Sequence, residues 1–419
     1  MSKPLFIISA PVDTYSGYGA RSRDIVDAII ATDRYDVKIL SQRWGNTRFG
    51  YLADHKRQDM IKLILPHVVK KPDYWMQITV PNEFTPAGKY NIGCTAGMEN
   101  TLVAPQWIEG VNRMDVVWTS SEHSKLVFEA TAYDTEDKKT KTKGQLKCTT
   151  PIEVIFEGVD TTKYLPSPGD KLDLSDIQEQ FCYLLVGHWM QGDFGEDRKN
   201  VGYTIKTFLE TFKNKPKQPA LILKTSLVNT SILDRDRLLQ RIDDIRKTVK
   251  GKLPNIYLLH GELSDDNINN LYNHSKVKVM VSHTKGEGFG RPLLEFTTTG
   301  KPVIASGWSG QVDFLDKDKS ILIGGTLENV HQSATVKDMI LKDAKWFKPN
   351  DGETARAYKE TFKHYKKYLI PAKQQRARTN KEFTLNHMFT LVDNRLKELL
   401  PEFPQEVELK LPELELPKL

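Results

Sequence analysis

One segment of the chain, residues 282–295, has the residue types and spacing of a ligand-binding turn. In order, it contains Gly286, Glu287, Gly288, Gly290 and Glu295. Glycines let a backbone turn tightly and approach a ligand, and the helix expected after them offers free N–H groups and a positive dipole end that suit phosphate. Glu287 on the loop and Glu295 a turn or two into the helix are expected to face one ligand and accept hydrogen bonds from sugar hydroxyls.

A second glycine-containing loop follows at 307–311, after the apolar run 302–305. Its backbone N–H groups, including that of Gly310, form another place where phosphate can be cradled. The simpler alternative for both loops is a pair of tight turns between strand and helix, with Glu287 and Glu295 as solvated surface acids.

Alternating apolar runs and amphipathic stretches must position these loops. Strands are expected at 5–9, 37–40, 76–80, 90–94, 116–120, 152–156, 182–186, 220–223, 256–259, 277–281, 302–305 and 321–323. Most of these are continuous apolar runs, which is typical of parallel strands covered on both faces. Helices are expected at 21–31, 201–212, 234–247 and 265–274. The alternation predicts an α/β fold with doubly wound parallel sheets.

A stretch rich in proline and glycine at 165–170 divides the pattern, and the strands restart after it. We therefore expect one Rossmann-like domain at 1–165 and a second at 170–345. Residues 346–400 are expected to be C-terminal helices that cross back to the first domain, with a basic helix at 353–373 broken by Pro371. Residues 401–419 are expected to be an extended or disordered tail.

Composition places the chain among ordinary globular proteins. It has 419 residues, 27% of them charged, and a formal net charge of +6. No apolar run is long enough for a membrane helix, and the short one at the N-terminus does not predict a signal peptide. Three widely spaced cysteines, Cys94, Cys148 and Cys182, show no metal-ligand spacing and fit buried thiols in a reducing cytoplasm.

As an ordered set, these motifs resemble the retaining glycosyltransferases of the GT-B fold, in the large family 4 group. Further matching pieces are Glu-Gly-Val-Asp at 157–160, Tyr-Leu-Leu-Val-Gly at 183–187, Lys-Asn-Val at 199–201, His-Gly-Glu-Leu-Ser at 260–264 and Gly-Lys-Pro-Val-Ile-Ala at 300–305. The resemblance covers the C-terminal half well and the N-terminal half loosely. It implies two Rossmann-like domains facing across a cleft, the donor bound to the second and the acceptor to the first.

The resemblance implies roles for residues around the donor. Glu295 would bind the ribose hydroxyls and Glu287 the transferred sugar. Lys199, with Arg198, would neutralise the diphosphate, although a plain surface lysine is the alternative for Lys199. The backbone positions implied to lie against sugar or phosphate are Gly17, Gly19, Gly288, Phe289 and Gly290.

The chain departs from the family at one donor position. The family commonly has arginine directly after the glycine of its first C-terminal strand, whereas this chain has Gly187-His188 and then an insertion at 189–197. Which cation meets the β-phosphate is therefore open. The Asp-x-Asp at 234–236 has the spacing of a metal clamp but opens a helix instead of following a strand, so we expect no metal ion. The resemblance also implies retention of anomeric configuration.

Acceptor residues are sought in the loops of the first domain. Candidates are Gln77, Asn82 and Glu83, the turn at 97–100 with Glu99, and the serine-rich turn at 119–124 with His123, which is more simply an exposed histidine at a helix start. A lysine run at 138–147, expected to form a hairpin, contains Lys138, Lys139 and Lys141. Such a run is usually a solvated face, yet it would also serve a polyanionic acceptor.

Several strings across the chain, at 81–84, 90–93 and 192–200, look like glycosyltransferases encoded by T4-like bacteriophages. That resemblance implies a UDP-sugar donor of glucose or arabinose type, 5-hydroxymethylcytosine in DNA as acceptor, and the host cytoplasm as location. Aromatic residues that could stack on a flipped base are Tyr18, Trp44, Tyr74 and Trp75, although core packing is the simpler role for most of them.

Two other functions remain open. A transferase acting on a lipid-linked sugar, a cell-surface glycan or a small molecule would be indicated by an amphipathic basic-aromatic face, for which Phe362, Tyr365 and Tyr368 are candidates. A non-catalytic nucleic-acid-binding protein with a degenerate transferase fold would not need the glutamate pair.

Overall fold

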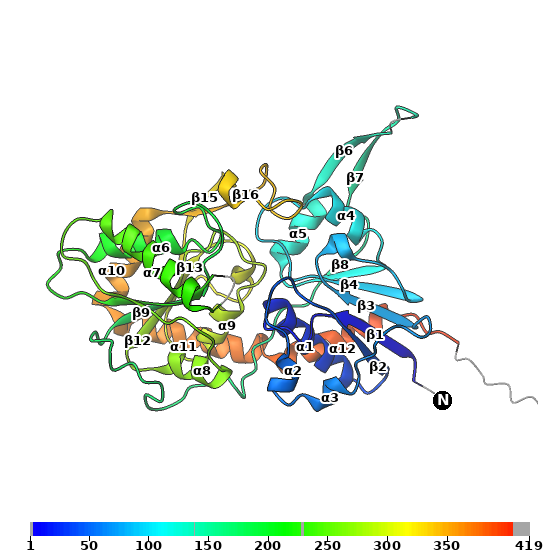
Figure 1. Cartoon of the computed structure of the whole chain (residues 1–419), viewed down its shortest axis with the longest axis horizontal. Coiled ribbons are helices and arrows are strands. Elements are labelled where there is room, and N and C mark those ends of the chain that lie inside the picture. The colour runs from blue at the N-terminus through cyan, green and yellow to red at the C-terminus, as the bar shows by residue number, and fades with distance from the viewer. Residues whose placement is uncertain (1–2, 138, 228–229, 405–419) are drawn as a thin grey trace, which may run out of the picture.

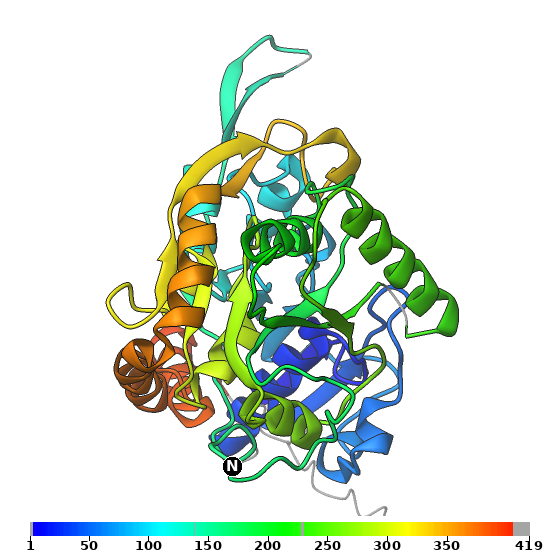
Figure 2. The same cartoon turned by 90° about the vertical axis from the view of Figure 1, so that its left-hand side faces the viewer.

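The computed structural model describes residues 3–137, 139–227 and 230–404. Two domains lie side by side, each built on a six-stranded sheet whose strands are all parallel (Figure 1). Helices cover the sheets, as Figure 2 shows for the second domain. This arrangement confirms the predicted α/β fold class with two doubly wound domains.

The first sheet has the strand order β2-β1-β3-β4-β5-β8. Its strands are β1 (Leu5–Ala10), β2 (Asp36–Ser41), β3 (Tyr74–Ile78), β4 (Tyr90–Cys94), β5 (Val116–Thr119) and β8 (Ile152–Val154). The connections contain α1 (Gly17–Ala31), α2 (Tyr51–Asp54), α3 (Gln58–Ile61), η1 (Pro81–Glu83), α4 (Pro105–Val111) and α5 (Glu122–Ala130). Every residue of β1 and β3 is buried, which explains the continuous apolar runs in the sequence.

The second sheet has the order β11-β10-β9-β12-β13-β14. Its strands are β9 (Cys182–His188), β10 (Ala220–Ser226), β11 (Ile256–Leu258), β12 (Val277–Ser282), β13 (Val303–Ser306) and β14 (Ile321–Ile323). Between them lie α6 (Val201–Phe212), α7 (Ile232–Lys247), α8 (Asp265–Asn273), α9 (Arg291–Thr297) and η2 (Gly310–Asp313). The carboxyl ends of the central strands β9 and β12 carry the loops with Arg198, Lys199 and Glu287.

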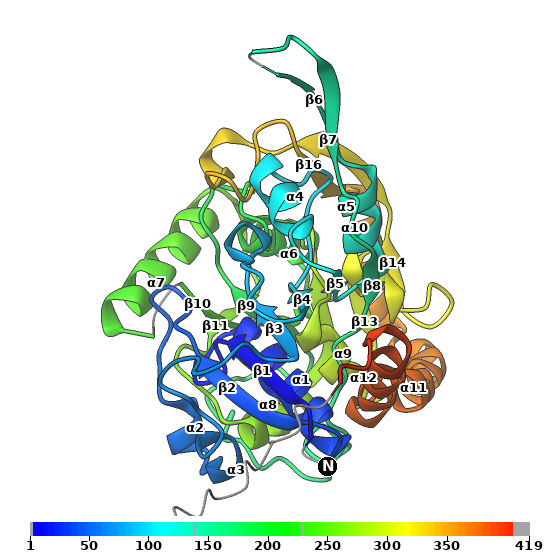
Figure 3. The same ribbon diagram turned by 90° about the vertical axis from the view of Figure 1, so that its right-hand side faces the viewer.

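Two antiparallel pairs are added to this framework. The hairpin β6 (Ala132–Glu136) and β7 (Lys143–Lys147) projects from the first domain, as Figure 3 also shows. The second pair, β15 (Gly325–Asn329) and β16 (Lys345–Pro349), flanks η3 (Gln332–Ala334) and reaches the first domain. There Thr101 donates its N–H to the Lys345 carbonyl, and Leu341 packs on the first domain's core. We call residues 325–349 the interdomain arm.

Three C-terminal helices join the domains: α10 (Asp351–Lys363), α11 (Tyr365–Glu382) and α12 (Leu385–Leu399). The predicted break at Pro371 is wrong, because α11 runs through this proline and the chain bends instead at His364. Helix α12 packs on α1 and contributes Met388, Val392 and Leu396 to the core of the first domain. Of the predicted tail, residues 405–419 lie outside the described residues.

The candidate membrane-facing aromatics do not form an exposed stripe. Phe362 and Tyr365 turn inward, with ring centroids 5.1 Å and 5.5 Å from that of Phe181 beside the core of the second domain. Among the described residues, no helix combines the length and the apolar character needed to cross a bilayer.

Docking of α12 on the first domain leads to a stability prediction. Leu396 is 1% exposed in the first domain's core, so Leu396→Ala should lower the free energy of unfolding by about 2–5 kcal/mol. The matched control Leu126→Ala, at a side chain 61% exposed, should change it by less than about 0.5 kcal/mol. Urea denaturation of both variants measures the difference, and equal unfolding midpoints would contradict the docking.

Candidate active site

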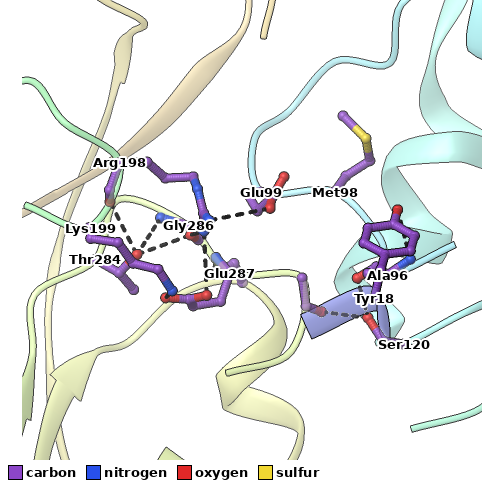
Figure 4. Close-up of polar contacts among 12 residues, drawn as sticks. Tyr18, Ala96, Met98, Glu99, Ser120, Arg198, Lys199, Thr284, Gly286 and Glu287 are labelled. Atoms are coloured by element: carbon purple, nitrogen blue, oxygen red, sulfur yellow. Dashed lines mark hydrogen bonds and ion pairs between the residues drawn. The ribbon is translucent and has the colours of Figure 1, made fainter. Parts of the chain in front are cut away.

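The glycine loop between β12 and α9, residues 283–290, lies directly on the backbone of the first domain. A Cβ on Gly286 would overlap the Glu99 carbonyl oxygen, and one on Gly288 would overlap that of Ala96. Ser120 donates its hydroxyl towards the carbonyls of both Ala96 and Gly288, and so bridges the two domains (Figure 4). Glycine is therefore required here for contact between domains, a reason that the sequence pattern does not reveal.

Glu287 is buried among cations. Its Oε1 lies 2.5 Å from Lys199 Nζ and its Oε2 3.4 Å from Arg198 Nη1 (Figure 4). Burial alone would raise the pKa of Glu287, but the charges of Lys199 and Arg198 outweigh burial and hold that pKa below its ordinary value. The structure thus brings together all three residues that the resemblance implies for chemistry.

Arg198 also reaches across to the first domain. Its guanidinium donates to the Gly286 carbonyl at 2.8 Å and lies 3.6 Å from Glu99 Oε1. Glu99, expected on the acceptor side, therefore faces the Arg198 guanidinium of the second domain. Arg198 has a carboxylate from each domain as a partner, so a phosphate that binds it must share or replace these contacts.

Lys285 fixes the segments that carry these groups. Its ammonium lies 3.0 Å from Glu196 of the insertion and 2.9 Å from Glu328 of the interdomain arm. Its backbone N–H donates to the Arg198 carbonyl, and its own carbonyl accepts from the Phe347 N–H. One buried lysine thereby joins the insertion, the glycine loop and the interdomain arm. The sequence shows only a lysine next to a glycine and does not predict this role.

Glu295 belongs to a second buried cluster, separate from the Glu287 contacts. One of its oxygens lies 3.3 Å from Arg291 Nε and the other accepts from the Tyr272 hydroxyl at 3.4 Å. Arg291 also pairs with Asp24 of α1 at 2.6 Å, and so ties α9 to the first domain. Burial raises the pKa of Glu295 to about 7, although Arg291 opposes this. The pairing of Arg291 with Glu295 could be predicted from their i,i+4 spacing, but the contacts with the distant residues Tyr272 and Asp24 could not.

The first glycine turn has one structural and one open glycine. Gly19 donates its N–H to the Ser16 side chain at the start of α1, and a Cβ there would overlap Thr14. Gly17 is exposed, and a Cβ would meet nothing within 4 Å among the described residues. Packing explains Gly19, whereas the need for a glycine at 17 has no explanation in the protein's own contacts.

The loop at 307–311 supports the glycine loop. The Gly310 N–H donates to the Glu287 carbonyl, and the Glu287 N–H donates to Ser309 Oγ. The sequence predicts that the Gly310 N–H is free to bind phosphate. In the structure this N–H is instead bonded within the protein. Gly290 begins α9 with a φ of 101°, and the Phe289 side chain is buried in the second domain's core.

His188, at the end of β9, lies beside the cation cluster. Its Nδ1 lies 3.0 Å from Ser226 Oγ, and a Cβ on the preceding Gly187 would contact the Lys199 side chain at 3.8 Å. Burial, with a contribution from Lys199, lowers the pKa of His188. A neutral His188 leaves Arg198 and Lys199 as the cations of this cluster.

The acceptor candidates separate into two regions. His123 is partly buried rather than exposed: its ring centroid lies 4.6 Å from that of Trp308, with 69° between the planes, and burial lowers its pKa to about 4. Exposed Lys139 and Lys141 lie on the projecting hairpin, away from α9 (Figure 1), and Lys141 pairs with Glu136. Lys138 lies outside the described residues.

Residues 249–347 match the protein-family profile described as "Glycosyl transferases group 1". A glycosyltransferase from Rickettsia africae has a similar structure, with 15% identity, a TM-score of 0.62 and coverage of 96% of this chain and 99% of that one. Sucrose-phosphate synthase from Thermosynechococcus elongatus matches at 12% identity and a TM-score of 0.62, over 95% and 99%. HepE from Anabaena, in complex with UDP-glucose, matches at 14% and 0.60, over 94% and 100%. No protein of curated function matches the sequence.

Burial of Lys285 leads to a prediction with an internal control. Lys285→Met would leave Glu196 and Glu328, whose side chains are 31% and 30% exposed, without their buried partner and should lower the free energy of unfolding by about 1–3 kcal/mol. Lys348 also pairs with Glu328, at 3.2 Å, but is 58% exposed, so Lys348→Met should cost at most about 1 kcal/mol. Similar denaturation midpoints for the two variants would show that Lys285 does not hold the segments together.

Proposed function

We propose a donor and an acceptor for this chain, which is a nucleotide-sugar-dependent glycosyltransferase with a group 1 domain in a GT-B fold. The donor is a UDP-sugar of glucose or arabinose type, transferred with retention. The observation that carries the donor assignment is the convergence of Arg198, Lys199 and Glu287 at the carboxyl ends of the central strands, where open parallel sheets bind ligands.

Arg198 and Lys199 would bind the diphosphate and stabilise the charge that develops on it as it leaves. Fixed cations in a water-poor site stabilise such charge at little reorganisation cost. The bond between the anomeric carbon and the diphosphate breaks, the acceptor oxygen bonds to that carbon on the same face, and the acceptor's proton passes to the leaving phosphate. Protein cations do this work in the proposal, and no metal ion takes part.

Glu287 and Glu295 then have different tasks. Glu287, kept ionised by Lys199 and Arg198, is available to accept hydrogen bonds from hydroxyls of the transferred sugar. Glu295 would accept from the ribose hydroxyls, for which it must lose the proton that its raised pKa favours. Donor binding should consequently depend on pH.

We propose 5-hydroxymethylcytosine in DNA as the acceptor, whose primary alcohol is the attacking group. The exposed lysines of the β6–β7 hairpin, including Lys139, Lys141 and Lys143, would contact DNA phosphates outside the cleft. A lipid-linked acceptor is less favoured, because two of the three aromatics that would mark a membrane face, Phe362 and Tyr365, pack against Phe181. A glycan or a small molecule is the alternative acceptor.

Transfer from a panel of UDP-sugars tests the acceptor. Purified protein is incubated with each donor and with hydroxymethylcytosine DNA, unmodified DNA, a glycan, a small alcohol or no acceptor, and UDP release is compared with the mass gain of each acceptor. We expect a mass gain on hydroxymethylcytosine DNA only. Equal UDP release with and without acceptor, or transfer to the glycan alone, would overturn the DNA acceptor.

The raised pKa of Glu295 predicts pH-dependent donor affinity. A carboxyl with a pKa of about 7 is mostly protonated at pH 6 and mostly ionised at pH 8, so its ionised fraction, and with it the affinity for UDP-glucose, should rise about 10-fold over this range. Calorimetric titration measures the dissociation constant. Glu295→Gln should bind UDP-glucose more weakly, with a dissociation constant that does not vary with pH. If this variant kept the pH dependence of the wild type, the ribose role would be contradicted.

A further inference from the structure

A loop dense in arginine and aromatic side chains joins β2 to α2. Residues 42–50 read Gln-Arg-Trp-Gly-Asn-Thr-Arg-Phe-Gly and contain no acidic residue. The loop is held on the first glycine turn, because Phe49 forms a β-bridge with Thr14 and the Arg48 carbonyl accepts from the Tyr15 N–H. We call residues 42–50 the Arg–Trp loop.

Trp44 of this loop is placed unlike the buried tryptophans. It stacks on Tyr18, with ring centroids 3.9 Å apart and an angle of 22° between the planes, and it belongs to no hydrophobic cluster of the described residues. Its side chain is partly exposed. Its indole N–H has no hydrogen-bond partner among those residues, whereas Tyr74 and Trp75 are buried in the core. Packing of the fold therefore explains Tyr74 and Trp75 but not Trp44.

Tyr18 connects Trp44 to the site of transfer. Its hydroxyl contacts Thr95 Oγ1 at 2.9 Å and accepts from the Ala96 N–H at 3.2 Å (Figure 4). The Ala96 carbonyl is the group on which Gly288 packs, next to Glu287. A ring stacked on Trp44 would thus be separated from the loop expected to hold the transferred sugar by the Trp44 indole and Tyr18.

The charges of the Arg–Trp loop are unequally satisfied. Arg48 is neutralised by Glu262 of the second domain and by Asp54, each at 2.6 Å. Arg43 is exposed, forms no ion pair with a described residue, and has its guanidinium 5.6 Å from the centre of the partly exposed Phe49 ring. The loop therefore presents a partly exposed indole and one cation that pairs with no carboxylate of a described residue.

We propose that the Arg–Trp loop binds the acceptor DNA strand: a nucleobase stacks on the Trp44 indole, and an adjoining phosphate pairs with Arg43. This inference rests on the proposed DNA acceptor. Nucleobases stack on aromatic side chains irrespective of sequence, and arginine adds charge and cation–π attraction. A neutral glycan would also pack on the indole but would leave Arg43 without a counter-ion.

Kinetics with a short single-stranded oligonucleotide carrying one hydroxymethylcytosine test the proposal. Trp44→Ala should raise the KM for the oligonucleotide about 5-fold to 100-fold, the loss expected from one base stack, while the KM for the UDP-sugar stays unchanged. Trp44→Phe should recover most of the affinity, and Arg43→Gln should weaken the salt dependence of binding. Ile370→Ala is the control, since Ile370 is a large apolar side chain 69% exposed on α11, and it should change neither KM.

The outcomes separate this inference from the acceptor on which it rests. Anisotropy of the labelled oligonucleotide measures binding alongside transfer. If the wild type modifies DNA but Trp44→Ala keeps the wild-type KM and binding, the stacking site is overturned and the DNA acceptor stands. If the wild type neither binds nor modifies the oligonucleotide, both are overturned, and selective loss of glycan transfer in Trp44→Ala would assign the indole to a sugar instead.

Discussion

The ion pair between Glu287 and Lys199 constrains the architecture around it. Moving a carboxylate and an ammonium out of water costs several kcal/mol per ion, which only close pairing and further hydrogen bonds can offset. Arg198 supplies a second partner to Glu287, and Lys285 fixes the backbone of Arg198 while pairing with Glu196 and Glu328. The insertion, the glycine loop and the interdomain arm are thus interdependent, because each contributes a group that keeps a buried charge satisfied.

Both buried charge clusters of the second domain also reach the first domain. Arg198 lies near Glu99, Arg291 pairs with Asp24, and Ser120 bridges Ala96 and Gly288. A phosphate bound to Arg198 would share or replace its contact with Glu99, and so change one of the contacts that join the two domains.

Much of the framework could be predicted from the sequence, because buried parallel strands leave continuous apolar runs and the motifs occur in a fixed order. Glu287, Arg198 and Lys199 converge as the resemblance implies. Contacts between segments that are distant in the sequence could not be predicted from it. The glycines at 286 and 288 pack on the backbone of the other domain, and His123 packs on Trp308. The helix break predicted at Pro371 is wrong, because α11 continues through this proline.

A crystal structure of the protein with an intact UDP-sugar is the most direct test of the donor site. We predict diphosphate oxygens within hydrogen-bond distance of Lys199 Nζ and the Arg198 guanidinium, a sugar hydroxyl on Glu287, and ribose hydroxyls on Glu295. A donor bound with its diphosphate away from Arg198 and Lys199, with the Glu287–Lys199 pair intact and untouched, would contradict this prediction.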